Sequence, residues 1–310
     1  MEQEIYDLVI IGSGPAGLAA AIYAARAELN FIIVEKEPMS GGQIINTYEV
    51  DNYPGLPGIS GFDMAMKFRE HSDKLGAKHV YGTVTKFELK GTLKHIVLDN
   101  GDEYDTKTAI IANGAAYRKL GVKGEQELSG MGVSYCATCD GAFFKNRTVA
   151  VVGGGDVAVE DAIFLARFCK QVHVIHRRDQ FRAAKTLSTK LLSLPNVTIS
   201  WNHVVEEIQG DDQVSGIKIK DVVTNQESIL SVDGVFIAVG TLPNSSVYQG
   251  IINMNQTGYL IADETCQTNI SGVFAAGDIR TKQLRQIITA ASDGANAITS
   301  VERYLNELSE

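Results

Sequence analysis

Two segments of the chain share one pattern, in which a β-branched apolar run is followed by a glycine-rich turn and an alanine-rich stretch. The first extends from Tyr6 to Arg26, and the second from Thr148 to Cys169. Another apolar run follows each segment, at Phe31 to Val34 and at Val172 to Ile175. A strand–helix–strand order with fully apolar strands is typical of a parallel sheet covered by helices. The repeat therefore predicts an α/β protein with two nucleotide-binding domains.

The length and composition agree with two domains. The chain has 310 residues, enough for two domains of about 150 residues each. Apolar residues make up 45% of it, and the net charge is −9, which disfavours nucleic acid or an anionic membrane as the main partner. No apolar stretch reaches the ~20 residues of a membrane span. No signal peptide is visible and the four cysteines are too few for a disulfide scaffold, so we expect a cytoplasmic protein.

The first glycine-rich turn has the pattern GxGxxG, with the residues Gly12, Ser13, Gly14, Pro15, Ala16 and Gly17. In a dinucleotide-binding turn the first glycine allows the tight turn, the second lets the backbone approach a pyrophosphate, and the third lets helix and strand pack closely. Glu35 ends the next strand, where a carboxylate can accept hydrogen bonds from an adenosine ribose. The alternative is that these glycines serve only a strand–helix corner, which the flanking strands and the acid disfavour.

The second turn has the pattern GxGxxA, with the residues Gly153, Gly154, Gly155, Asp156, Val157 and Ala158. At the position that corresponds to Glu35 the chain has His176, followed by Arg177 and Arg178, with Arg182 nearby. A carboxylate would repel a 2′-phosphate, whereas an arginine fork binds it. This site therefore predicts NADPH rather than NADH. The alternative is a solvated basic patch, but this patch lies where the ribose is recognised.

Cys136 and Cys139 form a CxxC motif between the two segments, and Asp140 follows it directly. A zinc site would need a second pair of ligands, and none is apparent, so no metal site is predicted. A redox dithiol is favoured, in which one sulfur attacks a partner disulfide and the second resolves the mixed disulfide. Asp140 is either the acid that protonates a leaving thiolate or a helix-capping or turn residue. Cys169 is expected to pack in a core.

In this order the motifs resemble those of low-molecular-weight, bacterial-type thioredoxin reductases over essentially the full length of the chain. The supporting segments are 12–17, 41–43, 52–55, 136–140, 153–160, 176–179 and 276–278. The resemblance implies an α/β fold with two Rossmann-like nucleotide-binding domains, in which the NADPH domain is inserted in the FAD domain. The FAD domain would comprise residues 1–116 and 245–310, and the NADPH domain with its redox CxxC would comprise residues 117–244.

The resemblance also implies further cofactor contacts. In this family the residues at the positions of Glu35 and Lys36 lie at the adenosine end of FAD, and Val84 supplies backbone near the adenine. The other expected FAD contacts, near the flavin, its linker or the ribitol-pyrophosphate, are Gly41, Gly42, Gln43, Asn52, Gly277, Asp278, Arg285, Gln286 and Ile287.

Three positions depart from the family pattern. Asn113 and Val157 stand where the family commonly has Thr and Ser, and both changes are conformationally mild. Ser292 stands where the family commonly has Gly. A side chain at position 292 disfavours the close backbone approach that is usual there in the family.

The function implied by the resemblance is that of an NADPH-dependent thioredoxin-disulfide reductase and a homodimer. Electrons would pass from NADPH through FAD and the Cys136–Cys139 disulfide to thioredoxin, with Cys139 next to the flavin and Cys136 attacking the partner. One alternative is a related reductase with a peroxiredoxin-type acceptor or a ferredoxin donor. Ferredoxin-fed relatives lack the basic residues after the second turn, which argues against that donor. Another alternative is a flavin-binding protein without turnover.

Overall fold

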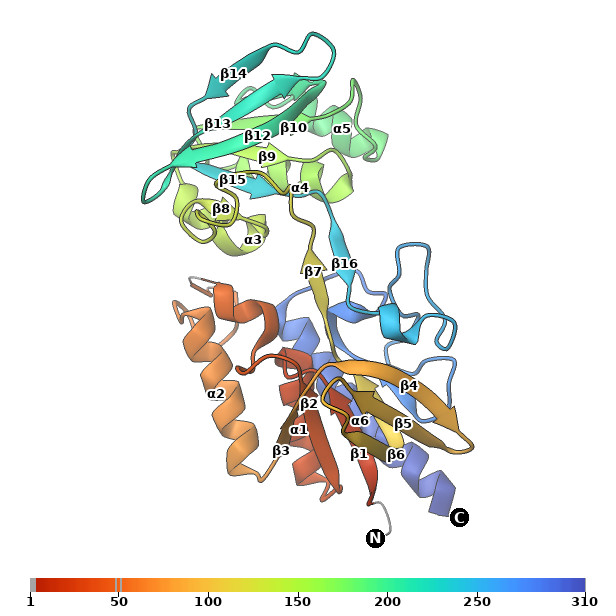
Figure 1. Ribbon diagram of the computed structural model, residues 1–310. Helices are drawn as coiled ribbons and strands as arrows, with labels where there is room; N and C mark the ends of the chain where they lie inside the picture. The colour runs from red at the N-terminus through yellow and green to blue at the C-terminus, as the bar shows by residue number, and fades with distance from the viewer. Residues whose placement is uncertain (1–3, 48, 51, 310) are drawn as a thin grey trace. The chain divides into compact units, whose positions relative to one another are not determined.

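A computed structural model describes residues 4–47, 49–50 and 52–309 of the protein. The chain forms two compact units (Figure 1). Unit 1 comprises Met1–Ala116 and Leu242–Glu310, and unit 2 comprises Tyr117–Thr241. Unit 2 is therefore an insertion in unit 1, and it ends at residue 241, whereas the resemblance places the boundary at residue 244.

Unit 1 is built on a seven-stranded sheet with the order β3-β2-β1-β6-β5-β4, in which β17 also pairs with β6. Strands β1, β2, β3, β6 and β17 are parallel, whereas β4 and β5 are antiparallel to their neighbours. Successive side chains of a strand point to opposite faces, so Leu8 and Ile10 belong to one core and Val9 and Ile11 to another. The strands are β1 (Ile5–Ile11), β2 (Phe31–Glu35), β3 (Lys78–Tyr81), β4 (Val84–Lys90), β5 (Leu93–Leu98), β6 (Glu103–Ile111) and β17 (Val273–Ala275).

Helices α1 and α6 cover one face of this sheet and pack against each other (Figure 1). Their close approach depends on Gly294, because a Cβ there would lie 2.2 Å from the carbonyl oxygen of Ala16. Ser292 has an exposed side chain, so it does not obstruct this approach. The helices of unit 1 are α1 (Pro15–Arg26), α2 (Gly61–Lys74) and α6 (Ile287–Ser309), with the 3₁₀ turns η1 (Gly42–Asn46), η3 (Ser246–Tyr248) and η4 (Gly277–Ile279).

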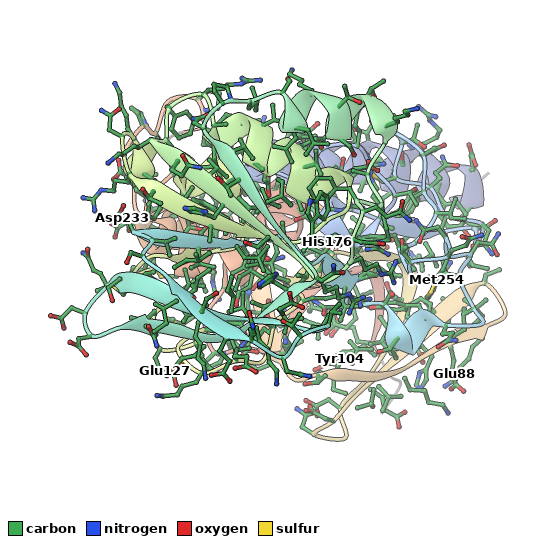
Figure 2. All side chains as sticks on the ribbon, turned by 90° about the horizontal axis from the view of Figure 1, so that it is seen from above. Glu88, Tyr104, Glu127, His176, Asp233 and Met254 are labelled. Carbon is green, nitrogen blue, oxygen red and sulfur yellow. A yellow bond between two sulfur atoms is a disulfide. The ribbon has the colours of Figure 1, made fainter. Side chains whose placement is uncertain are left out.

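Unit 2 has a parallel five-stranded sheet with the order β11-β10-β9-β15-β8 and an antiparallel sheet with the order β12-β13-β14. Helix α4 packs on one face of the parallel sheet, where Cys169 joins the core as predicted, and the antiparallel sheet packs on the other. All side chains are drawn in Figure 2. The elements are β8 (Val133–Ser134), α3 (Ala137–Asp140), η2 (Gly141–Phe144), β9 (Thr148–Val152), α4 (Asp156–Leu165), β10 (Gln171–His176), α5 (Lys185–Leu192), β11 (Val197–Trp201), β12 (His203–Gly210), β13 (Val214–Asp221), β14 (Glu227–Leu230) and β15 (Gly234–Ile237).

The chain leaves unit 1 in β7 (Ala115–Tyr117) and returns in β16 (Thr241–Pro243), and these two strands pair with each other. Hydrogen bonds hold their ends together on the unit 1 side. The buried Tyr248 hydroxyl donates to Oδ1 of Asn113 over 2.9 Å, and Nδ2 of Asn244 donates to the Asn113 carbonyl oxygen over 2.8 Å. The Asn113 side chain therefore accepts a hydrogen bond from the Tyr248 hydroxyl, which a phenylalanine at position 248 could not donate.

Gly294→Ala should lower the stability of unit 1 because the added Cβ forces α6 away from α1. Overpacking of a close contact costs about 1–3 kcal/mol. The measurement is the urea midpoint by circular dichroism. Ser292→Ala, an exposed change on the same helix, serves as the control and should leave the midpoint nearly unchanged. Equal midpoints for both variants would contradict the close contact.

His79 should make folding sensitive to acid. Its side chain is 2% exposed in β3, and neither ring nitrogen has a hydrogen-bond partner in the part of the chain that the structure describes. Burial, and next the charge of Arg69, lower its pKa from 6.5 to about 4. Between pH 6.5 and 4 His79 therefore binds a proton in the unfolded chain but not in the folded chain. The free energy of unfolding falls as the pH drops through this range, by at most about 1.4 kcal/mol per pH unit. His79→Leu should flatten this slope in urea titrations at several pH values, and an unchanged slope would refute the assignment.

Candidate functional site

A disulfide joins Cys136 and Cys139, whose Cα atoms lie 5.3 Å apart. Cys136 directly precedes the single turn α3 and Cys139 lies within it, and this turn follows β8 at the edge of the parallel sheet of unit 2. Both cysteines are only half-buried, so a partner thiol can approach them from solvent. Within the described ranges, no group of three or more His, Cys, Asp or Glu side chains is arranged to hold a metal ion.

Ser134 organises the loop around the disulfide. Its hydroxyl donates to Oδ2 of Asp140 over 2.5 Å and accepts the backbone N–H of Cys136 over 3.0 Å. Burial raises the pKa of Asp140, and the hydrogen bond from Ser134 offsets part of this rise. The Asp140 side chain makes no capping hydrogen bond to η2. A buried acid beside a disulfide keeps its proton to a higher pH than usual, as the protonation of a leaving thiolate requires.

The first glycine-rich turn connects β1 to α1 at the carboxyl end of the central strand. Gly12 has a φ of +104°, and a Cβ there would lie 2.5 Å from the Ala112 carbonyl oxygen. A Cβ on Gly17 would lie 1.8 Å from the carbonyl oxygen of Gly12. A Cβ on Gly14 would have one neighbour, the Gly41 carbonyl oxygen at 4.0 Å, and no side chain caps the start of α1. The turn thus presents backbone N–H groups at a helix N-terminus, which favours an anionic ligand.

Glu35 is buried at the end of β2 and binds the first turn. Its Oε2 accepts the backbone N–H and the hydroxyl of Ser13, both over 2.7 Å, and its Oε1 accepts a backbone N–H two residues later over 3.0 Å. A carboxylate has about four acceptor positions, so one remains for a ribose hydroxyl. The N–H of Gly82 donates to the Glu35 carbonyl oxygen over 2.9 Å, which brings the start of β4 at Val84 toward this carboxylate. Lys36, the next residue, is exposed.

Asp278 lies in η4, which packs against the first turn of α1. A Cβ on Gly277 would lie 2.9 Å from the Cβ of Ala16. Oδ1 of Asp278 is buried without a hydrogen-bond partner among the residues that the structure describes, and burial raises the pKa of this carboxyl. An unpaired buried acceptor is costly. The position therefore suits a hydroxyl or N–H donor of a ligand.

Two other groups of expected FAD contacts lie around the same turn. The N–H of Gly41 donates to the carbonyl oxygen of Ser13 over 2.8 Å. Gly42 and Gln43 begin η1, and the Gln43 amide donates to the carbonyl oxygen of Ala115. These contacts place segment 41–43 between the first turn and strand β7.

The second group lies at the start of α6. Nδ2 of Asn52 donates to Oε1 of Gln286 over 3.0 Å, directly before the helix begins at Ile287. The Arg285 guanidinium lies 4.0 Å from the centre of the Tyr259 ring, a cation–π contact. Two segments far apart in the sequence are thus joined by a side-chain hydrogen bond.

The second glycine-rich turn connects β9 to α4 in unit 2. A Cβ on Gly153 would lie 2.4 Å from a backbone carbonyl oxygen, whereas Gly155 has open space around it. The start of α4 also lacks a side-chain cap. Asp156 accepts the backbone N–H of Ala184 over 2.8 Å, and Val157 is 62% exposed. The backbone thus offers the same kind of anion site as in unit 1.

His176 supports this turn as a neutral ring and does not add positive charge to it. It is buried, and a Cβ on Gly154 would lie 2.2 Å from its ring. Nε2 donates to the carbonyl oxygen of Gln180 over 3.0 Å. Burial, and then the neighbouring arginines, lower its pKa. The predicted basic cluster is therefore limited to the arginines.

The three arginines lie beside the second turn with exposed side chains. Arg177 and Arg178 follow β10 directly, and the N–H of Arg182 donates to the carbonyl oxygen of Gly154 over 2.8 Å. This hydrogen bond fixes the backbone of Arg182 next to the turn. The arrangement can bind a phosphate at the carboxyl end of β10.

Comparisons with known proteins place these features in a family. The chain matches the pyridine nucleotide-disulphide oxidoreductase family over residues 6–294. It is 45% identical to the thioredoxin reductase of Bacillus subtilis, over 100% of this chain and 98% of the relative. The crystal structure of thioredoxin reductase from Streptococcus pyogenes is similar with a TM-score of 0.93 and 47% identity, over 98% of this chain and 99% of that one. A thioredoxin reductase from Giardia duodenalis has a TM-score of 0.93 and 33% identity, over 98% and 100%.

The chain belongs to the thioredoxin reductase family. The α/β fold with two Rossmann-like domains is confirmed, and so is the resemblance on which it was predicted. None of the helices in the described residues is both long and apolar enough to cross a membrane.

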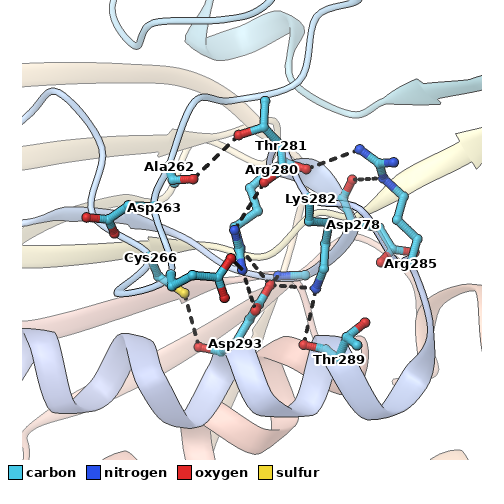
Figure 3. Close-up of polar contacts among 12 residues, drawn as sticks. Ala262, Asp263, Cys266, Asp278, Arg280, Thr281, Lys282, Arg285, Thr289 and Asp293 are labelled. Atoms are coloured by element: carbon cyan, nitrogen blue, oxygen red, sulfur yellow. Dashed lines mark hydrogen bonds and ion pairs between the residues drawn. The ribbon is translucent and has the colours of Figure 1, made fainter.

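Sequence reasoning missed two sets of residues that organise sites of this thioredoxin reductase family member. Ser134 was overlooked because a serine two positions before a cysteine is not itself a signal. A buried ionic cluster of Arg280, Lys282 and Asp293 lies beside η4 (Figure 3). The sequence signal for this cluster was an acid, Asp293, on the apolar face of α6, with two bases, Arg280 and Lys282, shortly before the helix begins.

Replacing Arg177 and Arg178 with alanine should raise the KM for NADPH at least about tenfold, because charge-assisted hydrogen bonds contribute about 1.5–3 kcal/mol each. The KM for NADH should change little, since it lacks the 2′-phosphate. Steady-state kinetics with both coenzymes measure this. Lys170→Ala, which removes one positive charge at the opposite end of β10, is the control and should affect neither coenzyme. Equal losses with NADPH and NADH would refute the ribose assignment.

Proposed function

We propose that this protein is an FAD-dependent thioredoxin reductase that oxidises NADPH and reduces the disulfide of a thioredoxin to a dithiol. The observation on which the proposal rests is the half-buried Cys136–Cys139 disulfide beside the buried carboxyl of Asp140, in a chain with two open glycine-rich turns. The overall reaction consumes NADPH, a proton and a disulfide, and yields NADP⁺ and two thiols. Unit 1 is proposed as the FAD domain and unit 2 as the NADPH domain.

The residues of unit 1 fit FAD. Gly14, where a Cβ would meet only the Gly41 carbonyl oxygen at 4.0 Å, and the uncapped start of α1 suit a diphosphate. The unpaired Oδ1 of Asp278 and the remaining acceptor position of Glu35 suit hydroxyl groups of the ribitol and the ribose. When bound, the flavin supplies the exchange of two electrons between a nicotinamide and a disulfide.

The residues of unit 2 fit NADPH. The glycine-rich turn at Gly155 is open toward a diphosphate, and the exposed arginines beside it suit a 2′-phosphate. His176 would contribute by packing under the turn. NADPH rather than reduced ferredoxin is therefore the proposed donor.

The chain's own sulfur chemistry proceeds by thiol–disulfide exchange. In the reduced pair the Cys136 thiolate attacks the thioredoxin disulfide, which forms a mixed disulfide and releases one partner thiolate. Asp140 is proposed to protonate a thiolate, and the hydrogen bond from Ser134 would hold its carboxyl for this role. Cys139 then attacks Cys136, which restores the intramolecular disulfide and releases the second partner sulfur. A homodimer remains a prediction of the family resemblance, and a cytoplasmic location remains a prediction from the few cysteines and the N-terminal sequence.

The test of this function is the oxidation of NADPH by the full-length protein with a panel of thioredoxin-like acceptors, including peroxiredoxin-type proteins. We expect a flavin spectrum that bleaches with NADPH under anaerobic conditions and turnover with a thioredoxin. If the flavin bleaches but no thioredoxin supports turnover, the protein is a related reductase with another acceptor. A protein without bound flavin would refute the proposal.

Cys136→Ser should leave FAD bound and reducible by NADPH but reduce thioredoxin turnover to background, because the attacking thiolate is gone. Cys139→Ser should trap thioredoxin as a mixed disulfide with Cys136, detectable by mass. Cys169→Ala, a core cysteine that is not part of the pair, is the control and should retain turnover. Substantial turnover by either serine variant would exclude this mechanism.

A further inference from the structure

A buried ionic cluster joins α6 to the segment after η4 (Figure 3). Asp293, on α6, is 4% exposed, and Arg280 is 2% exposed. The guanidinium donates twice to Asp293, from Nε to Oδ2 over 2.8 Å and from Nη2 to Oδ1 over 2.9 Å. Nζ of Lys282 donates to the same Oδ2 over 2.8 Å and to the carbonyl oxygen of Thr289 over 3.2 Å. One carboxylate thus accepts hydrogen bonds from two buried cations.

The same carboxylate holds the backbone of η4. The N–H of Gly277 donates to Oδ2 of Asp293 over 2.8 Å. Gly277 in turn packs on Ala16 in the first turn of α1, and Asp278 follows it with its unpaired Oδ1. Asp293 therefore determines, through one backbone hydrogen bond, where the Asp278 carboxyl lies relative to the glycine-rich turn.

The two cations of the cluster also act on acids other than Asp293. Arg280 lies 3.5 Å from Glu264, whose side chain is 91% exposed. Burial raises the pKa of Asp278, and the charges of Lys282 and Arg285 act against this rise, whereas the charge of Asp293 adds to it. The charge of Lys282 therefore reaches the residue that faces the open site.

A core that served only stability would not need these ions, since well-packed apolar residues are often as stable as a buried ion pair. What apolar residues could not do is accept the N–H of Gly277. We propose that Asp293 is a positioning residue for FAD, which holds the Gly277–Asp278 turn against the start of α1, and that Arg280 and Lys282 fix Asp293. This inference rests on the proposed function, because it assumes that unit 1 binds FAD.

The experiment is a double-mutant cycle on FAD affinity with Asp293→Asn and Asp278→Asn. The dissociation constant of FAD is measured by flavin fluorescence on the full-length protein freed of flavin, together with the rate of FAD release from the holoenzyme. If Asp293 acts through Asp278, Asp293→Asn should weaken FAD binding about tenfold or more with Asp278 present and less than about threefold with Asp278→Asn. Equal fold-changes in both backgrounds would overturn the proposal and leave Asp293 a purely structural residue.

Because Asp293→Asn leaves two buried cations unpaired and could prevent folding, Lys282→Met provides a second route. It keeps the hydrogen bonds of Arg280 and Gly277 to Asp293 but removes one of the two cations that fix the carboxylate. FAD should therefore bind several-fold more weakly with Asp278 present, and the loss should be smaller with Asp278→Asn. Unchanged affinity would overturn the role of Lys282 in fixing Asp293.

Ser300→Ala is the matched control, because it removes a buried hydrogen bond of α6 to the Thr265 carbonyl oxygen, which is 2.8 Å long and outside the cluster. It should lower the urea midpoint without changing FAD affinity, and a loss of affinity as large as that of Asp293→Asn would count against positioning. A wild-type protein that binds no FAD would refute the proposed function itself, whereas additive effects in a flavin-binding protein would refute only this inference.

Discussion

The first turn of α1 lies so close to its neighbours that unit 1 depends on glycine on three sides of it. Gly17 packs on the carbonyl oxygen of Gly12, Gly277 packs on the Cβ of Ala16, and Gly294 packs on the Ala16 carbonyl oxygen. These contacts join β1, η4 and α6 to the same helical turn. The start of the helix is thus packed by backbone and glycine. No side chain caps its N–H groups.

The two units use the same strand–turn–helix geometry and differ in the residue that ends the second strand. In unit 1 that residue is Glu35, whose carboxylate binds the turn through the N–H and hydroxyl of Ser13. In unit 2 it is His176, whose neutral ring packs on Gly154. The strand end therefore supports the turn in both units. Under the proposed function, Glu35 would also recognise the ribose in unit 1, whereas in unit 2 this role would belong to the exposed arginines that follow.

The parts of the fold that sequence predicted were those with a local signal. Apolar runs and glycine spacing predict β1, α1, β9 and α4, because strand burial and tight turns depend on a few consecutive residues. The burial of His176 could not be predicted, because it depends on Gly154 and on the backbone of Gln180 together. Likewise, the Asp293 cluster joins residues of α6 and η4 whose proximity follows only from the packing of α6 on α1.

Departures from a family pattern are best explained by the residues that they contact rather than by the residue type alone. Asn113, where the family commonly has Thr, accepts the hydroxyl of the fully buried Tyr248. This phenol needs a partner, since a buried hydroxyl without one is destabilising. Ser292, where the family commonly has Gly, has an exposed side chain, while Gly294 on the same helix provides the close approach to α1. Asn113 thus makes a contact of its own, whereas at Ser292 the close approach is provided by a neighbour on the same helix, so neither departure disturbs the packing around it.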